Sequence, residues 1–296
     1  MAKTTTKKAT ETKEVKSTQA PKPGVERLKD GTIKINLVIP QSKIAEVGTV
    51  VIDDLAKQVT VQGFRKGNAP KEIAAQHLSP DTIREEILKR LLPDAYMKAV
   101  EENKLKPIMN PKMHIEKVEE GQDWVFSAHT CELPEVDPGD YKKNAKSVIA
   151  KNKPEAGKEN EAKKPPMDQI VKAVLEDAKV NVPEVLIDQE ADRLLSQLLQ
   201  DIKKLGLSLD QYLGSTNRKP EDLKEEYKKR AEQDIKLEFV LQKIAEVEKV
   251  AVDEKEVNEA IMKAQSPAER QHMEANKYLL AGILRQQKTL DLLANL

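Results

Sequence analysis

Three short stretches in the first half of the chain alternate hydrophobic with polar residues. One covers 31–39, and two more cover 113–118 and 124–133 with a polar turn at 119–122 between them. Alternation places every second side chain on one face of a strand, so we predict three half-buried strands, the last two forming a hairpin. The buried face of the first strand is predicted to consist of Ile33, Ile35, Leu37 and Ile39.

Between these strands the hydrophobic residues recur at intervals of three and four. One such stripe covers 42–61, and a second follows Ser79-Pro80, a pair that suits the first turn of a helix. Between them, Pro70 suits the first turn of a further helix. We therefore predict three helices and an α+β domain over 25–140, in which helices cover a small sheet. The second stripe consists of Ile83, Ile87, Leu88, Leu91 and Leu92.

Helical periodicity dominates 167–296, and no strand is predicted there. At three helix starts a Ser or Asp is followed three residues later by Glu or Gln, a pattern that satisfies exposed backbone N–H groups reciprocally. Narrow apolar stripes on long, charged helices favour an elongated all-α domain. The predicted starts are at Asp168, near Pro183, at Ser208, near Pro220, at Asp253 and at Ser266.

The chain has 296 residues and no net charge, because 50 Lys and Arg balance 50 Asp and Glu. Residues 1–24 carry six Lys and two Glu (+4), and 141–166 carry eight Lys and three Glu (+5), whereas 25–140 and 167–296 carry −4 and −5. The basic segments have few apolar side chains to bury, so we predict a disordered tail over 1–24 and a Lys- and Pro-rich linker over 141–166. Both are interpreted as solubilising spacers, and the alternative in which their lysines contact RNA phosphates stays open. The acidic balance of the two folded parts argues against general polyanion binding by either.

The sequence also indicates the cellular compartment in which the protein is found. No apolar run approaches the roughly 20 residues of a membrane-spanning helix, and the first twenty residues contain no signal-peptide core. The single cysteine, Cys131, excludes an intrachain disulfide, as is usual in a reducing compartment. We therefore expect a cytosolic protein without a membrane partner.

Sequence motifs of enzymes are absent, including those of nucleophilic hydrolases, phosphate-binding loops and dinucleotide-binding folds. His129 and Cys131 share a strand face and could supply two of the four ligands of a zinc ion. Two ligands are too few, so both are interpreted as ordinary strand residues. We predict no catalytic residue, no metal site and no cofactor.

The most distinctive feature is a loop at 63–70 between the first two predicted helices. Phe64 precedes Arg65 and Lys66, and the three lie between Gly63 and Gly67. The glycines let the backbone turn sharply, so the loop could present an apolar anchor beside two cations that reach phosphate or carboxylate groups. In the alternative interpretation Phe64 folds back onto the sheet and the cations only solvate the turn.

The run Gly63-Phe64-Arg65-Lys66-Gly67-Asn68-Ala69-Pro70 resembles the ribosome-docking signature of the bacterial trigger factor family, chaperones that meet nascent chains at the tunnel exit. The stretches 132–136, 182–190 and 205–213 resemble further parts of that family. The resemblance implies docking on a ribosomal protein and the adjacent ribosomal RNA. Asn68 stands where many members have Lys, which should weaken docking a little. The residues implied are Gly63, Phe64, Arg65, Lys66, Gly67 and Pro70.

Typical members of the family carry a prolyl-isomerase domain between the two parts found here. In this chain only 141–166 occupies that place, well below the roughly fifty residues of a viable domain. None of the nine aromatic residues lies between Tyr141 and Tyr212, so an aromatic-lined pocket cannot form there. We therefore predict a short form that lacks the isomerase domain and its activity.

The resemblance further implies an ATP-independent chaperone whose helical arms hold nascent or unfolded polypeptides. The last helix is predicted to supply part of the holding surface; in the alternative, its apolar residues pack against Met262 and the neighbouring helix. Two other functions stay open, a helical assembly adaptor for one folded partner and a residual isomerase, and so does homodimer formation by free molecules. The predicted holding residues are Met273, Tyr278, Leu279, Leu280, Ile283 and Leu284.

Overall fold

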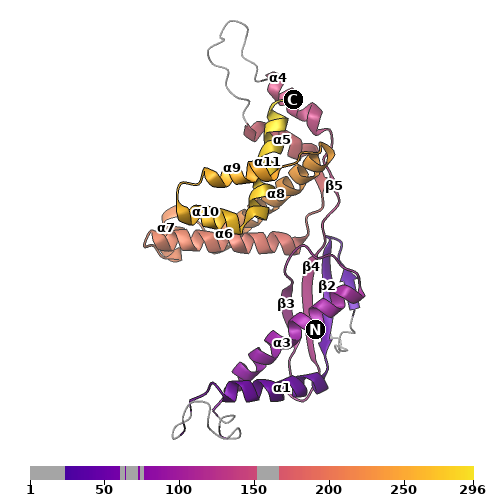
Figure 1. Ribbon diagram of the computed structural model, residues 1–296, viewed down its shortest axis with the longest axis vertical. Helices are drawn as coiled ribbons and strands as arrows, with labels where there is room; N and C mark the ends of the chain where they lie inside the picture. The colour runs from indigo at the N-terminus through magenta and orange to yellow at the C-terminus, as the bar shows by residue number, and fades with distance from the viewer. Residues whose placement is uncertain (1–23, 61–63, 65–72, 74–76, 152–166) are drawn as a thin grey trace, which may run out of the picture. The chain divides into compact units, whose positions relative to one another are not determined.

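The computed structural model describes residues 24–60, 64, 73, 77–151 and 167–296 (Figure 1). Its contacts separate two compact units, each described by itself below. The α+β first part and the mostly helical second part confirm the predicted fold class. The first unit consists chiefly of Lys34–Leu105 and Pro111–His129, and the second of Arg27–Ile33, Lys106–Asn110 and Thr130–Leu296.

A four-stranded sheet has the order β1-β2-β4-β3. β3 and β4 form the predicted antiparallel hairpin, with Lys112 opposite His129 and Ile115 opposite Phe126. The alternation in β2 is confirmed, because its four predicted core side chains are at most 4% exposed. The strands are β1 (Gly24–Arg27), β2 (Thr32–Ile39), β3 (Lys112–Lys117) and β4 (Trp124–Cys131).

Two helices of the first unit, α1 (Gln41–Ala56) and α3 (Pro80–Glu102), pack against each other. A Cβ atom on Gly48 of α1 would lie 3.3 Å from Ile87 Cδ1 of α3, so glycine permits this close approach. α1 has no side-chain cap of its own; instead the Gln41 N–H donates to Asp123 Oδ1 at 2.8 Å. The prediction that this helix continues to residue 61 is wrong, because α1 ends at Ala56.

The second unit is built mainly from helices, with one small sheet in which β5 (Val136–Asp137) pairs antiparallel with β6 (Lys179–Val180). Its core lies among α4, α5, α8 and α11, and α6 packs against α8. No helix in the described part of the chain is long and apolar enough to span a membrane. The helices are α4 (Tyr141–Lys151), α5 (Met167–Asp177), α6 (Glu184–Lys204), α7 (Leu209–Thr216), α8 (Pro220–Val247), α9 (Glu254–Met262), α10 (Pro267–Ala275) and α11 (Lys277–Ala294).

Three of the predicted helix starts are confirmed by the hydrogen bonds of their caps. Ser208 and Asp253 both form complete capping boxes, with Gln211 and Glu256 respectively. Ser266 accepts from the Glu269 N–H at 3.1 Å, but the Glu269 carboxylate accepts in return from the Gln265 N–H rather than from Ser266. Residue type and spacing therefore located these three helices to within one residue.

The predicted linker over 141–166 is wrong for its first eleven residues, which form α4. Tyr141 and Ala145 are buried in the core of the second unit, and Val148 and Ile149 pack against it. Apolar residues at this spacing share one helix face, which lets so basic a segment fold. Residues 152–166 of the predicted linker and 1–23 of the predicted tail lie outside the described residues.

Two further expectations for the second unit are corrected. The last predicted helix is two helices, α10 and α11, which meet at Asn276. The Asn276 side chain donates to the His272 carbonyl at 2.8 Å, a local bond that competes with helix continuation. β6 is a strand where none was predicted; at two residues it is too short to show an alternating pattern.

The start of α6 is capped from far away in the sequence. Its N-cap residue, Pro183, has no side-chain acceptor, and Asp30 Oδ2 accepts instead from the Glu184 N–H at 3.0 Å. The same carboxylate accepts from the Thr32 hydroxyl at 2.6 Å. Partial burial raises the pKa of Asp30, but these hydrogen bonds outweigh it and leave the pKa below its ordinary value.

Replacing Asp30 with alanine is expected to lower the free energy of unfolding by about 1–2 kcal/mol at neutral pH, because α6 loses its cap. Since the folded state holds the pKa of Asp30 below its unfolded value, the carboxylate stabilises the fold above roughly pH 4 and loses that contribution as the pH falls through its folded pKa. Urea unfolding followed by circular dichroism should therefore show a wild-type advantage that shrinks in acid. Asp30→Asn keeps an acceptor and should lose less; an equal loss in both variants at every pH contradicts the capping role.

Candidate functional site

Phe64 follows α1 and is the part of the predicted docking loop that the structure describes. Its side chain is 41% exposed, so it is not a core residue of the first unit. This exposure disfavours the alternative in which Phe64 is buried against the sheet. The other predicted docking residues, Gly63, Arg65, Lys66, Gly67 and Pro70, lie outside the described residues.

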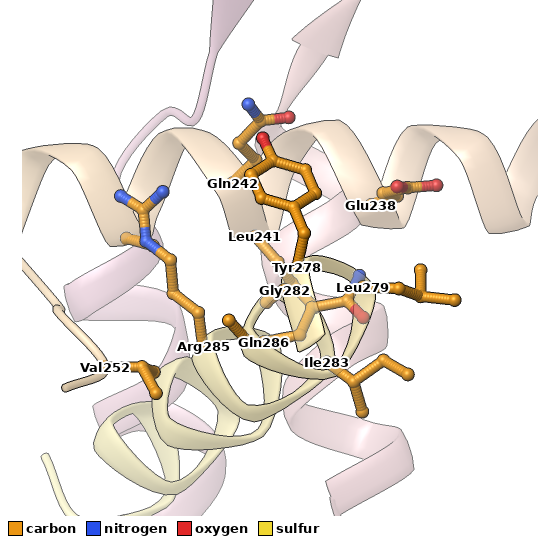
Figure 2. A pocket seen from close by; sticks show the side chains of 12 residues that line it. Glu238, Leu241, Gln242, Val252, Tyr278, Leu279, Gly282, Ile283, Arg285 and Gln286 are labelled. Atoms are coloured by element: carbon orange, nitrogen blue, oxygen red, sulfur yellow. The ribbon is translucent and has the colours of Figure 1, made fainter. Parts of the chain in front are cut away.

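A groove of about 440 Å³ lies between α8 and α11 in the second unit (Figure 2). α8 contributes two buried apolar side chains, Leu241 and Ala245, together with the exposed Glu238 and Gln242. Figure 2 shows Tyr278 of α11 reaching toward Gln242, with Arg285 and Val252 at one end of the groove and Glu238 and Leu279 at the other. The remaining lining residues are Ala281, Gly282, Ile283 and Gln286, all on α11.

Three apolar side chains on α11 are strongly exposed at this groove. Tyr278 is 95% exposed, Leu279 62% and Ile283 52%. Between them lies Gly282, where an added Cβ would meet no atom within 4 Å. Tyr278, Leu279 and Ile283, here called the apolar rim, therefore border space that another molecule could fill.

The other end of α11 is firmly held. Arg285 Nε donates to the Val250 carbonyl at 2.9 Å, and Lys288 Nζ donates to both carboxylate oxygens of Glu256, at 2.6 and 2.9 Å. The hydrogen bond and charge of Lys288 lower the pKa of Glu256, assisted by the Asp253 N–H. Further along, Leu293 is completely buried. Because α11 is fixed through its second half, the apolar rim is presented on a rigid support rather than on a loose end.

The structure divides the predicted holding residues. Tyr278, Leu279 and Ile283 line the groove, whereas Met273, Leu280 and Leu284 are half-buried and do not. The alternative in which the apolar residues pack against Met262 is wrong for the apolar rim, because its members are exposed and Met262 is itself 74% exposed. The α8 side of the groove was not predicted, because no local pattern shows which helix pairs with α11.

A second hollow, of about 470 Å³, lies on another side of α8. It is lined by Phe239 and Lys243 of α8 and by the segment 133–136, whose Leu133 is 53% exposed. Gln242 lines both this hollow and the α8–α11 groove. The amide of Gln242 therefore stands between two partly apolar depressions and can donate to one side and accept from the other.

The residues weighed as zinc ligands are ordinary members of the sheet. Cys131 is fully buried, and this burial, with a smaller effect of Asp30, raises the pKa of its thiol to about 11, which keeps it protonated. His129 lies beside His114, with ring centroids 4.6 Å apart and ring planes tilted by 50°. Within the described residues, no three His, Cys, Asp or Glu side chains are grouped to hold a metal ion.

Two models of one protein family match this chain. A family model described as "Bacterial trigger factor protein (TF)" matches residues 22–164, and one described as "Bacterial trigger factor protein (TF) C-terminus" matches residues 146–295. The two matches overlap, so no inserted isomerase domain separates them, as predicted. The chain therefore has the first and last parts of the family architecture in direct succession.

Individual relatives agree with these models. Trigger factors of Staphylococcus aureus strains JH9 and Newman are each 33% identical over 108 residues, which is 36% of this chain and 25% of each relative. The match thus spans a quarter of the length of these relatives. A solved structure described as "Promiscuous Substrate Recognition in Folding and Assembly Activities of the Trigger Factor Chaperone" shares the fold, with a TM-score of 0.57 and 14% identity over 92% of this chain and 99% of that one. On the two family models, which together cover nearly its whole length, the chain belongs to the bacterial trigger factor family.

Proposed function

We propose that this protein is an ATP-independent chaperone that docks at the ribosomal tunnel exit through the Phe64 loop and holds nascent or unfolded polypeptides at the α8–α11 groove. The apolar rim carries the holding part of this proposal. Single exposed apolar residues are common, but Tyr278, Leu279 and Ile283 gather at one hollow on one rigid helix. Such a surface suits a partner with apolar side chains of its own.

The chemistry of the groove suits many sequences rather than one. Gln242 and Gln286 line it with neutral amides that can both donate to and accept from the backbone of an unfolded chain. The apolar rim contacts side chains without regard to their exact shape. The structural relative is described as a chaperone with promiscuous substrate recognition, and a groove of this composition supports the same behaviour here.

Docking compensates for the weakness of such contacts. Burying one apolar side chain contributes about 1.5–3 kcal/mol, and part of that is lost in ordering the client, so a groove with three exposed apolar residues binds a free chain weakly. Tethering at the tunnel exit turns client binding into an almost intramolecular step, with an effective concentration in the millimolar range. Phe64, exposed and followed by two cations, supports this docking role.

Gly282 allows a test of the holding part with a closely matched control. The intact protein is expected to suppress aggregation of a chemically denatured client without ATP. Gly282→Glu should reduce that protection about tenfold, because a carboxylate then occupies the apolar groove and resists desolvation. Gly282→Ala should keep the protection and stabilise α11 by up to about 1 kcal/mol.

An added Cβ at this position meets no atom within 4 Å, so alanine should not disturb the fold. Circular dichroism checks that the Glu variant keeps the same helical content. Equal protection by the Glu and Ala variants contradicts client binding at this groove. If the intact protein gives no protection but forms a stoichiometric complex with one folded partner, it is an assembly adaptor instead.

We also infer that the chain has no prolyl-isomerase activity, because the two family matches leave no room for that domain. Purified protein at micromolar concentration should leave the isomerisation of a proline tetrapeptide at its uncatalysed rate, with a time constant of tens to hundreds of seconds at 25 °C. A protease-coupled assay measures this rate directly, and a known isomerase serves as the positive control. Acceleration that grows in proportion to protein concentration contradicts the inference.

A further inference from the structure

Helix α4 concentrates positive charge on a folded element. Its eleven residues include four lysines and no acidic residue. The segment 141–166 carries eight Lys and three Glu in all, so most of its basic excess belongs to α4. The chain that follows, 167–296, has an acidic balance. α4 is therefore a positively charged helix beside a chain segment of net negative charge.

The core fixes which side of α4 faces outward. Tyr141 and Ala145 are buried, and the helix packs against α5 and the end of α11, where Figure 1 shows it beside the C-terminus. The Tyr141 hydroxyl donates to the Glu248 carboxylate, which orients the first turn. The lysines on the opposite side of α4 therefore belong to a helix that is packed into the fold, and not to a free segment.

One of the four lysines is already neutralised. Lys142 Nζ lies 2.7 Å from Glu248 Oε1. Lys143, Lys146 and Lys151 are exposed, and within the described part of the chain none of them forms an ion pair. On α5, the Asp177 carboxylate accepts from the backbone N–H of Asp140 and from the Asn144 side chain.

The helix geometry spreads these three charges over a useful distance. At about 100° per residue they fall within an arc of roughly 140°, and the rise of 1.5 Å per residue places Lys143 and Lys151 about 12 Å apart along the axis. That span is comparable to two steps along a nucleic-acid backbone. Lysine is a strongly hydrated point charge suited to phosphate oxygens, and this face has no arginine or exposed aromatic residue that could read or stack a base.

We propose that the outward face of α4, formed by Lys143, Lys146 and Lys151, contacts the phosphate backbone of ribosomal RNA as a second, sequence-independent docking contact. The inference rests on the proposed ribosome docking and extends it to the second unit. It gives a role to the segment that stands where other members of the family carry the isomerase domain. Such a contact is predominantly electrostatic, so salt weakens it.

The triple substitution Lys143→Gln, Lys146→Gln and Lys151→Gln tests this contact. In co-sedimentation with 70S ribosomes between about 50 and 300 mM salt, the slope of log affinity against log salt should fall by about two to three units, with roughly tenfold weaker binding near 0.15 M. The corresponding Arg triple should keep the wild-type slope. A matched control, Gln at Lys224, Lys255 and Lys263, removes the same charge from exposed lysines of the same unit and should change the slope little.

A second probe identifies the partner. A fluorescein-labelled 20-base-pair RNA duplex should bind the intact protein weakly and lose that binding in the α4 Gln triple. An unchanged slope on ribosomes overturns the inference, and so does a reduced slope on ribosomes without any effect on RNA binding, which assigns the face to an acidic protein. If substitution of the Phe64 loop leaves ribosome binding intact while the α4 triple weakens it, the loop docking fails and the α4 contact stands.

Discussion

Replacing Phe64, Arg65 and Lys66 together with alanine is expected to raise the dissociation constant for ribosomes by about 100-fold or more near 0.15 M salt. An aromatic anchor that fills a pocket typically contributes 2 kcal/mol or more to an interface, and two cations on phosphate or carboxylate groups add to this. Phe64 is already 41% exposed in the free protein, so its removal should cost the fold little. Co-sedimentation over a range of ribosome concentrations measures the change.

A control triple removes one apolar side chain and two cations from another place in the same unit. Arg84, Met97 and Lys98 are on α3, and Met97 is 53% exposed, so their replacement with alanine also deletes one exposed apolar side chain and two cations. This control should bind ribosomes like the wild type, and both variants should keep their helical content by circular dichroism. Wild-type affinity in the loop variant shows that docking does not depend on the loop.

Local sequence patterns predicted the elements of this fold that have local causes. Alternation located β2, because one face of this strand lies against the core. It also located the β3–β4 hairpin, although the two strands are not half-buried as predicted: β4 is buried on both faces, and β3 is largely exposed. The side chains of Ser208 and Asp253 located two helix starts, because their caps are made within three residues. The cap of α6 could not be predicted, since its acceptor is Asp30, 154 residues away.

α4 shows how a segment average can hide a pattern. The composition of 141–166 indicated a linker, because Lys and Pro dominate it. Within it, however, Tyr141, Ala145, Val148 and Ile149 recur at helical spacing and join the core. Examined in windows of about eleven residues, the same sequence distinguishes a basic helix from the Pro-containing stretch that follows.

Of the two sides of the candidate groove, only the α11 side could be predicted from the sequence. Tyr278, Leu279 and Ile283 belong to an apolar run over 278–284, and that signal pointed to α11. Nothing local in the sequence pairs them with Leu241 and Ala245 of α8, because which helices pack together depends on the whole core of the second unit. The division of the last helix at Asn276 was also missed, since no glycine or proline marks it.

Replacing Tyr278, Leu279 and Ile283 with serine is expected to weaken binding of an unfolded client about 100-fold or more, because the groove then loses the three apolar contacts that border it. Each deleted contact contributes roughly 1 kcal/mol after the ordering of the client is subtracted. The three side chains are 95, 62 and 52% exposed, so their removal takes little from the core, and thermal unfolding should stay close to that of the wild type. Fluorescence anisotropy with a permanently unfolded, labelled polypeptide measures the affinity directly.

The matched control removes three exposed leucines from the end of α6 and the loop after it. Leu199, Leu205 and Leu207 are 45, 76 and 43% exposed, so serine at these positions lowers the exposed apolar area of the same unit without touching the groove. If the groove is the holding surface, this control keeps most of the client affinity and ribosome binding is normal in both variants. Equal losses in the two triples show that clients bind the exposed apolar surface of the second unit at large. No loss in the apolar-rim variant shows that the groove is not the holding surface.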